Sequence, residues 1–280
     1  MNKNELEFLW LDNYIMLDFK IYEKIMRFLK DVKELFILTT NENNFIKFLK
    51  TNKIYISKEL LKKMISNDLK YKAKIKLLEL KNKNINIITK NDKEFNYLFK
   101  NNVIAYAYGD INILKNNKVA IYNSSNLIHS SKSMLKEFIN YIKKMNYKIV
   151  SDILDEHTDI LCLEYLEPIK KEELLVISYK LKNNTKLKKE QKEEYKIMSN
   201  IAACVFFTPT NYNLKTVTLT DTFLENGKDI LAVPGNIYDE NTYFSNFLIK
   251  CGAIVVTSKK DFIDELKYLF NQQKNKLINI

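Results

Sequence analysis

The chain has 280 residues, of which 46% are hydrophobic and 12% aromatic, and it carries a formal charge of +11. This composition excludes an intrinsically disordered chain, and no apolar run approaches the length that crosses a membrane. The positive charge indicates a polyanionic partner, either a nucleic acid or an anionic membrane surface. Codon usage biased toward A and T would produce the same excess of lysine without any selection for binding.

Helical periodicity dominates the first part of the chain and predicts a small all-helical domain at residues 1–78. The first helical stripes contain Leu9, Tyr14, Met16, Ile21, Ile25, Met26, Phe28 and Leu29. Further helical segments are expected around residues 45–49, 60–64 and 71–81. Stripes of this kind are more often ordinary core than a binding surface.

From residue 79 onward, short apolar and β-branched runs alternate with helical segments, which predicts an α/β domain at residues 79–270. The expected strands cover residues 85–89, 103–108, 118–122, 147–151, 174–178, 203–207, 229–233 and 254–256. Helices are expected around 134–142, 160–166, 220–226, 244–248 and 262–269. The order of elements predicts a doubly wound, mostly parallel sheet with right-handed crossovers. Residues 271–280 are expected to form a polar tail.

The run Asp229–Asn236 is the most informative stretch of the sequence. It is a continuous apolar strand, typical of a strand that is covered on both faces, and it ends in Pro234 and Gly235. In open α/β sheets the ligand crevice lies outside the carboxyl ends of the strands. In a chain with only four glycines, Gly235 indicates a place where a side chain does not fit.

The three cysteines, Cys162, Cys204 and Cys251, lie in apolar surroundings without metal-ligand spacing. They are expected to be reduced, buried thiols of a cytoplasmic protein. No secretory leader is apparent at the N-terminus, and His129 and His157 have no neighbouring cluster of ligands. We therefore expect no metal site and no cofactor.

Two stretches near the C-terminus resemble the DNA-processing protein A family (DprA, also called Smf). Residues 224–235 resemble the segment around the family's Ala-Val-Pro-Gly, and residues 245–253 resemble its Gly-Thr-Asn-x-Leu-Ile-x-x-Gly-Ala. Weaker similarity adds Leu9-Trp10-Leu11, Ile87-Ile88-Thr89, Tyr108-Gly109-Asp110 and Val119-Ala120-Ile121. The resemblance therefore runs in order over most of residues 5–266.

The resemblance implies a small helical domain followed by an extended Rossmann-like domain that carries a site for single-stranded DNA. It also implies a homodimer. We expect no enzymatic activity, because the sequence shows no glycine-rich phosphate loop, no nucleophile–base constellation and no surviving arginine to hold a phosphate. By resemblance, such a dimer passes DNA to a RecA-type recombinase during natural transformation. We expect the C-terminal winged helix of many members to be lacking, because the chain is too short to contain it.

Several family motifs are altered. Asn123-Ser124-Ser125 replaces Gly-Ser-Arg, so the glycine that lets backbone N–H groups approach a phosphate is lost, and so is the arginine. The motif Ser-Gly-Leu-Ala-Arg-Gly-Ile-Asp is reduced to Ser151, with Asp155 and Glu156 soon after. Glu194-Tyr195-Lys196 stands for Arg-Asn-Arg, and Leu214-Lys215-Thr216-Val217 for Ser-Gly-Ser-Leu. A strand–helix unit is expected to be missing between residues 160 and 178.

The candidate DNA-binding and phosphate-binding residues follow from these positions. They are Ser124, Lys196, Lys215, Thr216, Gly235, Ser245, Asn246 and Lys250, with the lysines of residues 180–192 and Tyr212 or Tyr243 as further contacts. Lysines would neutralise phosphates, and tyrosines would stack on bases. In the alternative interpretation, the lysines form a solvated face, the tyrosines pack locally, and Ser245 and Asn246 only cap a helix.

Two other functions remain open at this point. A nucleotide-binding or hydrolysing enzyme would use Asp152, Asp155, Glu156 or Asp159 as acids or bases, although no glycine-rich phosphate loop supports them. A degenerate scaffold that acts through protein contacts would explain why the phosphate-binding motifs are altered.

Overall fold

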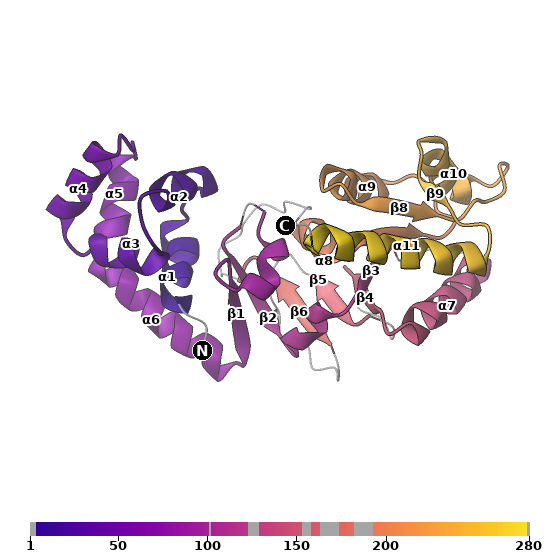
Figure 1. The fold of residues 1–280 in the computed structure, drawn as a ribbon, viewed down its shortest axis with the longest axis horizontal. Coiled ribbons are helices and arrows are strands. Elements are labelled where there is room, and N and C mark those ends of the chain that lie inside the picture. The colour runs from indigo at the N-terminus through magenta and orange to yellow at the C-terminus, as the bar shows by residue number, and fades with distance from the viewer. Residues whose placement is uncertain are drawn as a thin grey trace. The chain divides into compact units, whose positions relative to one another are not determined.

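The computed structural model describes residues 4–100, 102–122, 129–152, 158–162, 174–181 and 193–278. The chain divides into two compact units, Met1–Ala107 and Tyr108–Ile280 (Figure 1). This boundary differs from the expected one at residue 78. The reason is that strand β1 (Ile85–Thr89) packs against helices α1 (Glu5–Leu9) and α6 (Asn67–Asn82).

Short helices make up most of the first unit. They are α1, a π-helical segment Trp10–Ile15, α2 (Phe19–Met26), α3 (Val32–Leu38), α4 (Glu42–Thr51), α5 (Lys58–Ile65) and α6, followed by β1, a 3₁₀ segment Lys93–Leu98 and β2 (Ile104–Tyr108). Side chains cap the N-termini of five of them, since Asp18, Asp31, Asn41, Ser57 and Ser66 each accept a hydrogen bond from a first-turn N–H. These caps begin a new helix every few residues, which explains why one periodic stretch forms several short helices.

The core of the first unit is aromatic and encloses one lysine. The fully buried Trp10 meets Phe36 edge-on at a centroid separation of 5.1 Å. The ammonium of Lys70 lies 4.8 Å from the centroid of the Phe36 ring and donates to the Phe36 carbonyl oxygen at 3.0 Å. Burial lowers the pKa of Lys70 to about 8.

The second unit is built on parallel strands. They are β3 (Lys118–Ile121), β4 (Lys148–Ser151), β5 (Ile160–Cys162), β6 (Leu175–Ser178), β7 (Cys204–Phe207), β8 (Asp229–Ala232) and β9 (Ile254–Val255). Their order is β6-β5-β4-β3-β7-β8-β9, and every neighbouring pair is parallel. The chain reverses its winding between β3 and β7, so this sheet has the topological switch point of a doubly wound fold.

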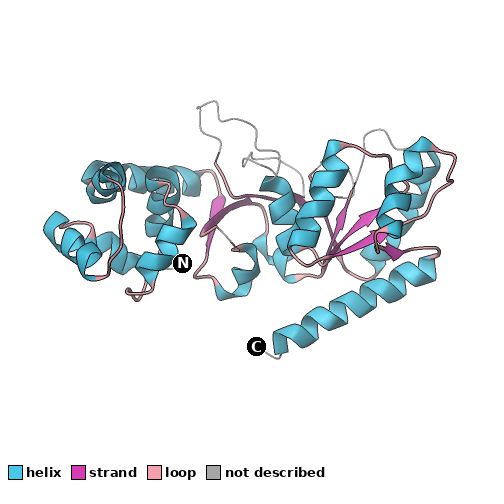
Figure 2. Cartoon of the chain, turned by 90° about the horizontal axis from the view of Figure 1, so that it is seen from above, coloured by secondary structure: helices cyan, strands magenta, loops and turns pink. Residues whose placement is uncertain are grey.

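Helices cover both faces of this sheet. α7 (His129–Lys144) and α11 (Lys259–Ile278) pack on one face, where Phe138, Phe206 and Phe262 form an aromatic cluster. α8 (Glu193–Ile201), α9 (Leu214–Glu225) and α10 (Tyr243–Lys250) pack on the other. Figure 2 shows α11, which ends near the C label, on one side of the strands. The α/β fold class with a mostly parallel sheet, predicted from the alternating elements, is confirmed.

Three details of the sequence prediction are wrong. Residues 160–166 were expected to be helical, but Ile160–Cys162 is a strand whose three side chains are buried between β4 and β6. The strand that was expected to be missing between residues 160 and 178 is therefore present. α9 begins at Leu214 instead of near residue 220, and α11 continues to Ile278 through most of the expected polar tail.

Candidate nucleic-acid interface

The carboxyl ends of β3, β4, β7 and β8 lie along the same edge of the sheet, because the strands are parallel. We call this edge the carboxyl edge. The first turns of α9 and α10 follow β7 and β8 there, and the first turn of α8 reaches the end of β4. Most of the residues that the sequence singled out lie in these turns.

At the end of β8, Gly235 is held by the side chain of Asn246 from α10. The Gly235 N–H donates to Asn246 Oδ1 at 3.0 Å, and Asn246 Nδ2 donates to the Gly235 carbonyl oxygen at 3.1 Å. A Cβ on Gly235 would lie 2.3 Å from Cγ2 of the buried Thr242, so only glycine fits here. Gly235 and Asn246 are thus brought together, as the sequence suggested, but they bind each other.

Ser245 is fully buried next to this pair. Its hydroxyl donates to the Thr242 carbonyl oxygen at 2.9 Å and lies 3.5 Å from the Thr210 N–H. The hydroxyl therefore links α10 to the segment after β7. This geometry favours the structural role of Ser245 and Asn246 over a direct contact with a ligand.

The start of α9 carries one exposed lysine on a capped turn. Asn213 Oδ1 accepts from the Thr216 N–H at 3.0 Å, and Thr216 Oγ1 accepts from the Asn213 N–H at 3.1 Å, which makes a capping box. Thr216 is fully buried in this arrangement, whereas Lys215 projects from the same turn into solvent. A helix N-terminus next to a lysine favours an anion.

A phenol occupies the switch point. Tyr122, the residue after β3, stacks on Phe207 at a centroid separation of 5.3 Å, and its hydroxyl accepts from Asn213 Nδ2 at 3.2 Å. Next to Phe207, the hydroxyl of the buried Thr208 has no hydrogen-bond partner among the described residues. Neither residue is indicated by the sequence, since nothing in the local pattern around Tyr122 or Thr208 distinguishes it from core.

Acidic groups lie beside the phenol, at the ends of β4 and α8. Tyr195 donates from its hydroxyl to Asp152 Oδ2 at 3.3 Å. Burial raises the pKa of Asp152, against the opposing charge of Lys215, and burial with the charges of Asp152 and Glu194 raises the pKa of Tyr195. Burial, followed by the same two charges, raises the pKa of the Cys162 thiol. Burial thus favours the protonated forms of Asp152, Tyr195 and Cys162, which lie close to one another at this part of the carboxyl edge.

Lys196 lies in the first turn of α8 with its side chain 48% exposed, and its ammonium is 2.8 Å from Glu193 Oε1. The Glu193 side chain of this pair is only 8% exposed, so its carboxylate competes with a phosphate for the Lys196 ammonium. Lys215 and Lys196 lie at the carboxyl edge, and so does Lys180, two residues after the end of β6, where its backbone N–H donates to Ser178 Oγ at 3.0 Å.

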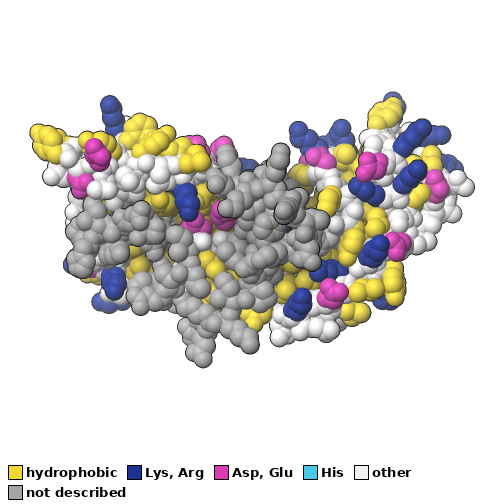
Figure 3. All heavy atoms as spheres, turned by 180° about the vertical axis from the view of Figure 1, so that it is seen from behind, with side chains coloured by type: hydrophobic (Ala, Val, Ile, Leu, Met, Phe, Trp, Pro, Cys, Tyr) yellow, Lys and Arg dark blue, Asp and Glu magenta, His cyan; other side chains and the backbone are white. Residues whose placement is uncertain are grey.

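Apolar side chains are unusually exposed around the start of α10. They are Tyr212, Leu214, Ile237, Tyr238, Tyr243 and Phe247, with exposed fractions between 51% and 87%. We call this set the aromatic patch. Tyr212 packs edge-on against Phe244 at 5.7 Å, and Phe244 stacks on Phe247 at 6.3 Å, which links the two sides of the patch. Figure 3 shows hydrophobic side chains at the surface over α9 and α10, at the upper left.

The remaining candidates lie elsewhere. Lys250 is the last residue of α10, roughly two turns from the carboxyl edge. Asp159 precedes β5 at the opposite edge, where its Oδ2 accepts from the Ile149 N–H at 2.8 Å, so it does not act together with Asp152. Cys251 is exposed, contrary to expectation, because it caps the C-terminus of α10. Ser124, Asp155, Glu156 and the lysines of 182–192 lie outside the described residues.

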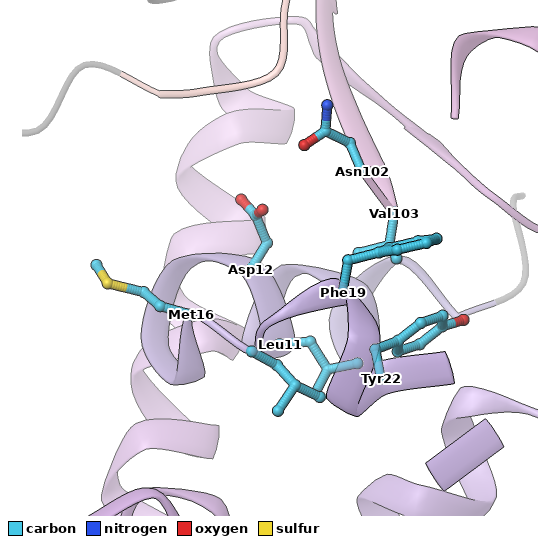
Figure 4. A pocket seen from close by; sticks show the side chains of 8 residues that line it. Leu11, Asp12, Met16, Phe19, Tyr22, Asn102 and Val103 are labelled. Atoms are coloured by element: carbon cyan, nitrogen blue, oxygen red, sulfur yellow. The ribbon is translucent and has the colours of Figure 1, made fainter. Parts of the chain in front are cut away.

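A separate cavity of about 70 Å³ lies within the first unit (Figure 4). Its lining combines the carboxylate of Asp12 and the amide of Asn102 with the rings of Phe19 and Tyr22. Tyr106, fully buried, donates to Asp12 Oδ2 at 2.9 Å and fixes that carboxylate. At about 30 Å³ for each water molecule, this volume accommodates about two of them. No local pattern in the sequence indicates the cavity, because Asp12 interrupts a helical stripe like any solvent-facing residue.

Within the described ranges, no three His, Cys, Asp or Glu side chains are grouped so that they could hold a metal ion. In the same part of the chain, each helix is too short or too polar to span a bilayer.

The comparisons with known proteins define the class of fold. No protein-family profile and no curated protein matches the sequence. Among solved structures, DNA processing protein A from Helicobacter pylori, described for its single-stranded DNA binding mode, is 16% identical. The match covers 67% of this chain and 96% of that chain at a TM-score of 0.54. DprA from Streptococcus pneumoniae is 14% identical and matches with a TM-score of 0.52 over 89% of this chain and 98% of its own. At these identities the likeness shows the fold alone.

Proposed function

We propose that this protein binds single-stranded DNA through the carboxyl edge of its Rossmann-like sheet. The observation that carries the proposal is the shared fold with two DprA proteins, one of which is described as binding single-stranded DNA. The formal charge of +11 supplies the long-range attraction that a polyanion requires.

The two chemical parts of DNA would be bound by different groups. Lys215 and Lys196 neutralise phosphates at the rim of the edge, while Tyr212 and Tyr243 present exposed ring faces on which bases stack. The centre of the edge holds Asp152 and Tyr195, which supply no positive charge to a phosphate. The DNA strand therefore passes along Lys215 and Lys196 at the rim and avoids the centre of the carboxyl edge.

The biological setting belongs to the same proposal. We infer that the protein acts by binding, without catalysis, in the cytoplasm as a homodimer, and that it passes DNA to a RecA-type recombinase in transformation or recombination. These inferences rest on the resemblance in sequence and fold, and DNA binding is the first of them to measure.

Fluorescence anisotropy with a labelled oligothymidine at increasing salt tests the proposal. We expect Lys215→Glu and Lys196→Glu to weaken binding, and the slope of log affinity against log salt to fall by roughly 0.7 for each phosphate that a lysine no longer neutralises. Lys143→Glu, at an exposed lysine near the end of α7, is the matched control and should bind like the wild type. If the folded wild-type protein does not bind the oligothymidine at low salt, the proposal is wrong.

A scaffold that acts through protein contacts is the second candidate. The aromatic patch favours it, since exposed aromatic and aliphatic side chains in one place are typical of protein interfaces. A Tyr243→Ala variant separates the two functions. It should reduce oligothymidine affinity if the ring stacks on bases, and leave it unchanged if the patch contacts protein.

A further inference from the structure

An apolar groove lies in the first unit, between the second half of α4, the connection after it and the first turns of α5 (Figure 1 shows the two helices). Its volume is about 320 Å³, within the range of roughly 300–1,000 Å³ that is typical of ligand pockets. The aliphatic part of its lining consists of Ile46, Leu49, Ile54, Ile56 and Leu61. Tyr55 also lines the groove and is 89% exposed.

The rim of the groove is basic. Lys50 and Lys53 line it, both are exposed, and neither forms an ion pair with any described residue. The surrounding segment, residues 46–65, contains six lysines and one glutamate. That glutamate, Glu59, is already paired with Lys63 at 2.9 Å. The groove thus offers aliphatic contacts next to uncompensated positive charge.

These properties restrict the occupant. A second copy of this chain is disfavoured, because the chain itself is strongly basic and its groove would meet like charge. Single-stranded nucleic acid combines phosphate contacts with the stacking of successive bases on aromatic rings, and this lining offers only one ring, that of Tyr55, among aliphatic side chains. An amphipathic peptide presents aliphatic side chains at helical spacing and docks in grooves of this kind.

We propose that the groove binds an acidic amphipathic segment of another protein, with its aliphatic side chains in the groove and its carboxylates on Lys50 and Lys53. This inference is independent of DNA binding, because the groove lies in the helical unit and shares no residue with the carboxyl edge. It assigns the helical unit a function of its own as an adaptor.

Fluorescence anisotropy of the full-length protein with labelled synthetic helical peptides tests the proposal. The probe carries leucines along one face and glutamates elsewhere, and a second peptide replaces each glutamate by lysine. We expect the acidic peptide to bind and the basic one not to bind. The double variant Lys50→Glu with Lys53→Glu should weaken binding of the acidic peptide on the order of tenfold or more, and should acquire affinity for the basic one.

Two further variants keep the test specific. Tyr55→Ala removes an exposed ring without disturbing the core and should weaken binding of the acidic peptide. Lys24→Glu with Lys33→Glu reverses two exposed lysines of α2 and α3 outside the groove and should leave binding within about twofold. Equal binding by the Lys50/Lys53 double variant, or no binding of the acidic peptide by the wild type, overturns the proposal. If the Lys50/Lys53 double variant loses oligothymidine binding and keeps peptide binding, the groove binds DNA instead of a peptide.

Discussion

Lys118 shows how a single charged residue is held inside the second unit. It begins β3, is 7% exposed, and donates from its ammonium to the carbonyl oxygens of Leu114 and Asn116, each at 2.6 Å. Burial, with a smaller effect from the charge of Lys228, lowers the pKa of Lys118 to about 8. The backbone of Lys118 is thus part of β3, and its ammonium bonds the carbonyl oxygens of the turn that precedes the strand.

This pKa predicts a pH-dependent stability. Between pH 8 and pH 10.5 the unfolded chain keeps the Lys118 proton while the folded protein releases it, so the free energy of unfolding rises with pH over this range. Below pH 8 the ammonium is charged in both states, and the folded protein bears the full cost of burying it. We expect the unfolding free energy of the wild type, relative to that of Lys118→Met, to increase by about 2 kcal/mol from pH 7 to about 9.5. Urea titrations at several pH values measure it, with Lys143→Met as the control for loss of one lysine. A constant difference would contradict the assignment.

At the residue scale, three of the predicted site residues are neighbours in the structure, while their role in binding stays a prediction. Gly235, Ser245 and Asn246 lie together, with the Asn246 side chain bonded to the Gly235 backbone. A Cβ at position 235 would clash with Thr242, which explains why a glycine-poor chain keeps glycine there. Their bonding partners, Thr242 and Thr210, were not foreseen, since hydrogen bonds across several residues leave no local pattern. Whether Lys196 and Lys215 contact DNA stays a prediction.

At the element scale, the end of β8 is locked to α10 by the Asn246 side chain. The amide satisfies both the N–H and the carbonyl of Gly235, which would otherwise be left without these partners in a partly buried turn. An amide side chain can donate and accept in this way from the same position. The turn after β8 therefore depends on α10 for its shape.

Asn246→Ala should lower the free energy of unfolding by about 1–3 kcal/mol, because it leaves backbone groups unsatisfied. If the role is structural, the folded variant should bind oligothymidine like the wild type. Asn241→Ala is the matched control, since the Asn241 side chain bonds to the neighbouring Asp239 at an exposed position. A stable Asn246→Ala protein with reduced DNA affinity would restore Asn246 to the binding site.

Helix boundaries were the weakest part of the sequence prediction at this scale. α9 starts at Leu214 because Asn213 and Thr216 form a capping box, but neither the glutamate nor the serine that usually marks such a box is present. The apolar run of β5 is compatible with a helix, because a three-residue buried strand shows no alternation. For β5, the deciding interactions come from the neighbouring strands.

At the scale of the whole molecule, the sheet was largely predictable. Continuous apolar runs such as Val119–Ile121 and Cys204–Phe207 are required wherever helices cover both faces, and the structure places them in the centre of the sheet. The unit boundary was not predictable, because helical periodicity ends near residue 80 while the contacts of β1 with α1 and α6 extend the first unit.

For the proposed homodimer we assign the interface to Leu214, Ile237 and Phe247 of the aromatic patch, which leaves the rings of Tyr212 and Tyr243 free to stack on bases. Sedimentation equilibrium should show a dimer for the wild type and a monomer for Phe247→Glu, because a carboxylate at the centre of an apolar interface is desolvated without a partner. Tyr268→Glu, at an exposed ring on α11 outside the patch, should leave the association unchanged. A wild-type monomer at high concentration would refute the dimer.

The strand order also has a consequence for synthesis. Ala120 in β3 pairs with Val205 in β7, far along the chain, although β4 follows β3 closely. During translation, one edge of β3 therefore remains unpaired until β7 has left the ribosome, and that edge is made of buried, uncharged residues at Val119, Ala120 and Ile121. Such an edge is a template for aggregation, and late closure of a long loop slows folding. The nascent protein is thus most vulnerable, and most in need of a chaperone, while the central strand of its finished sheet is still an edge strand.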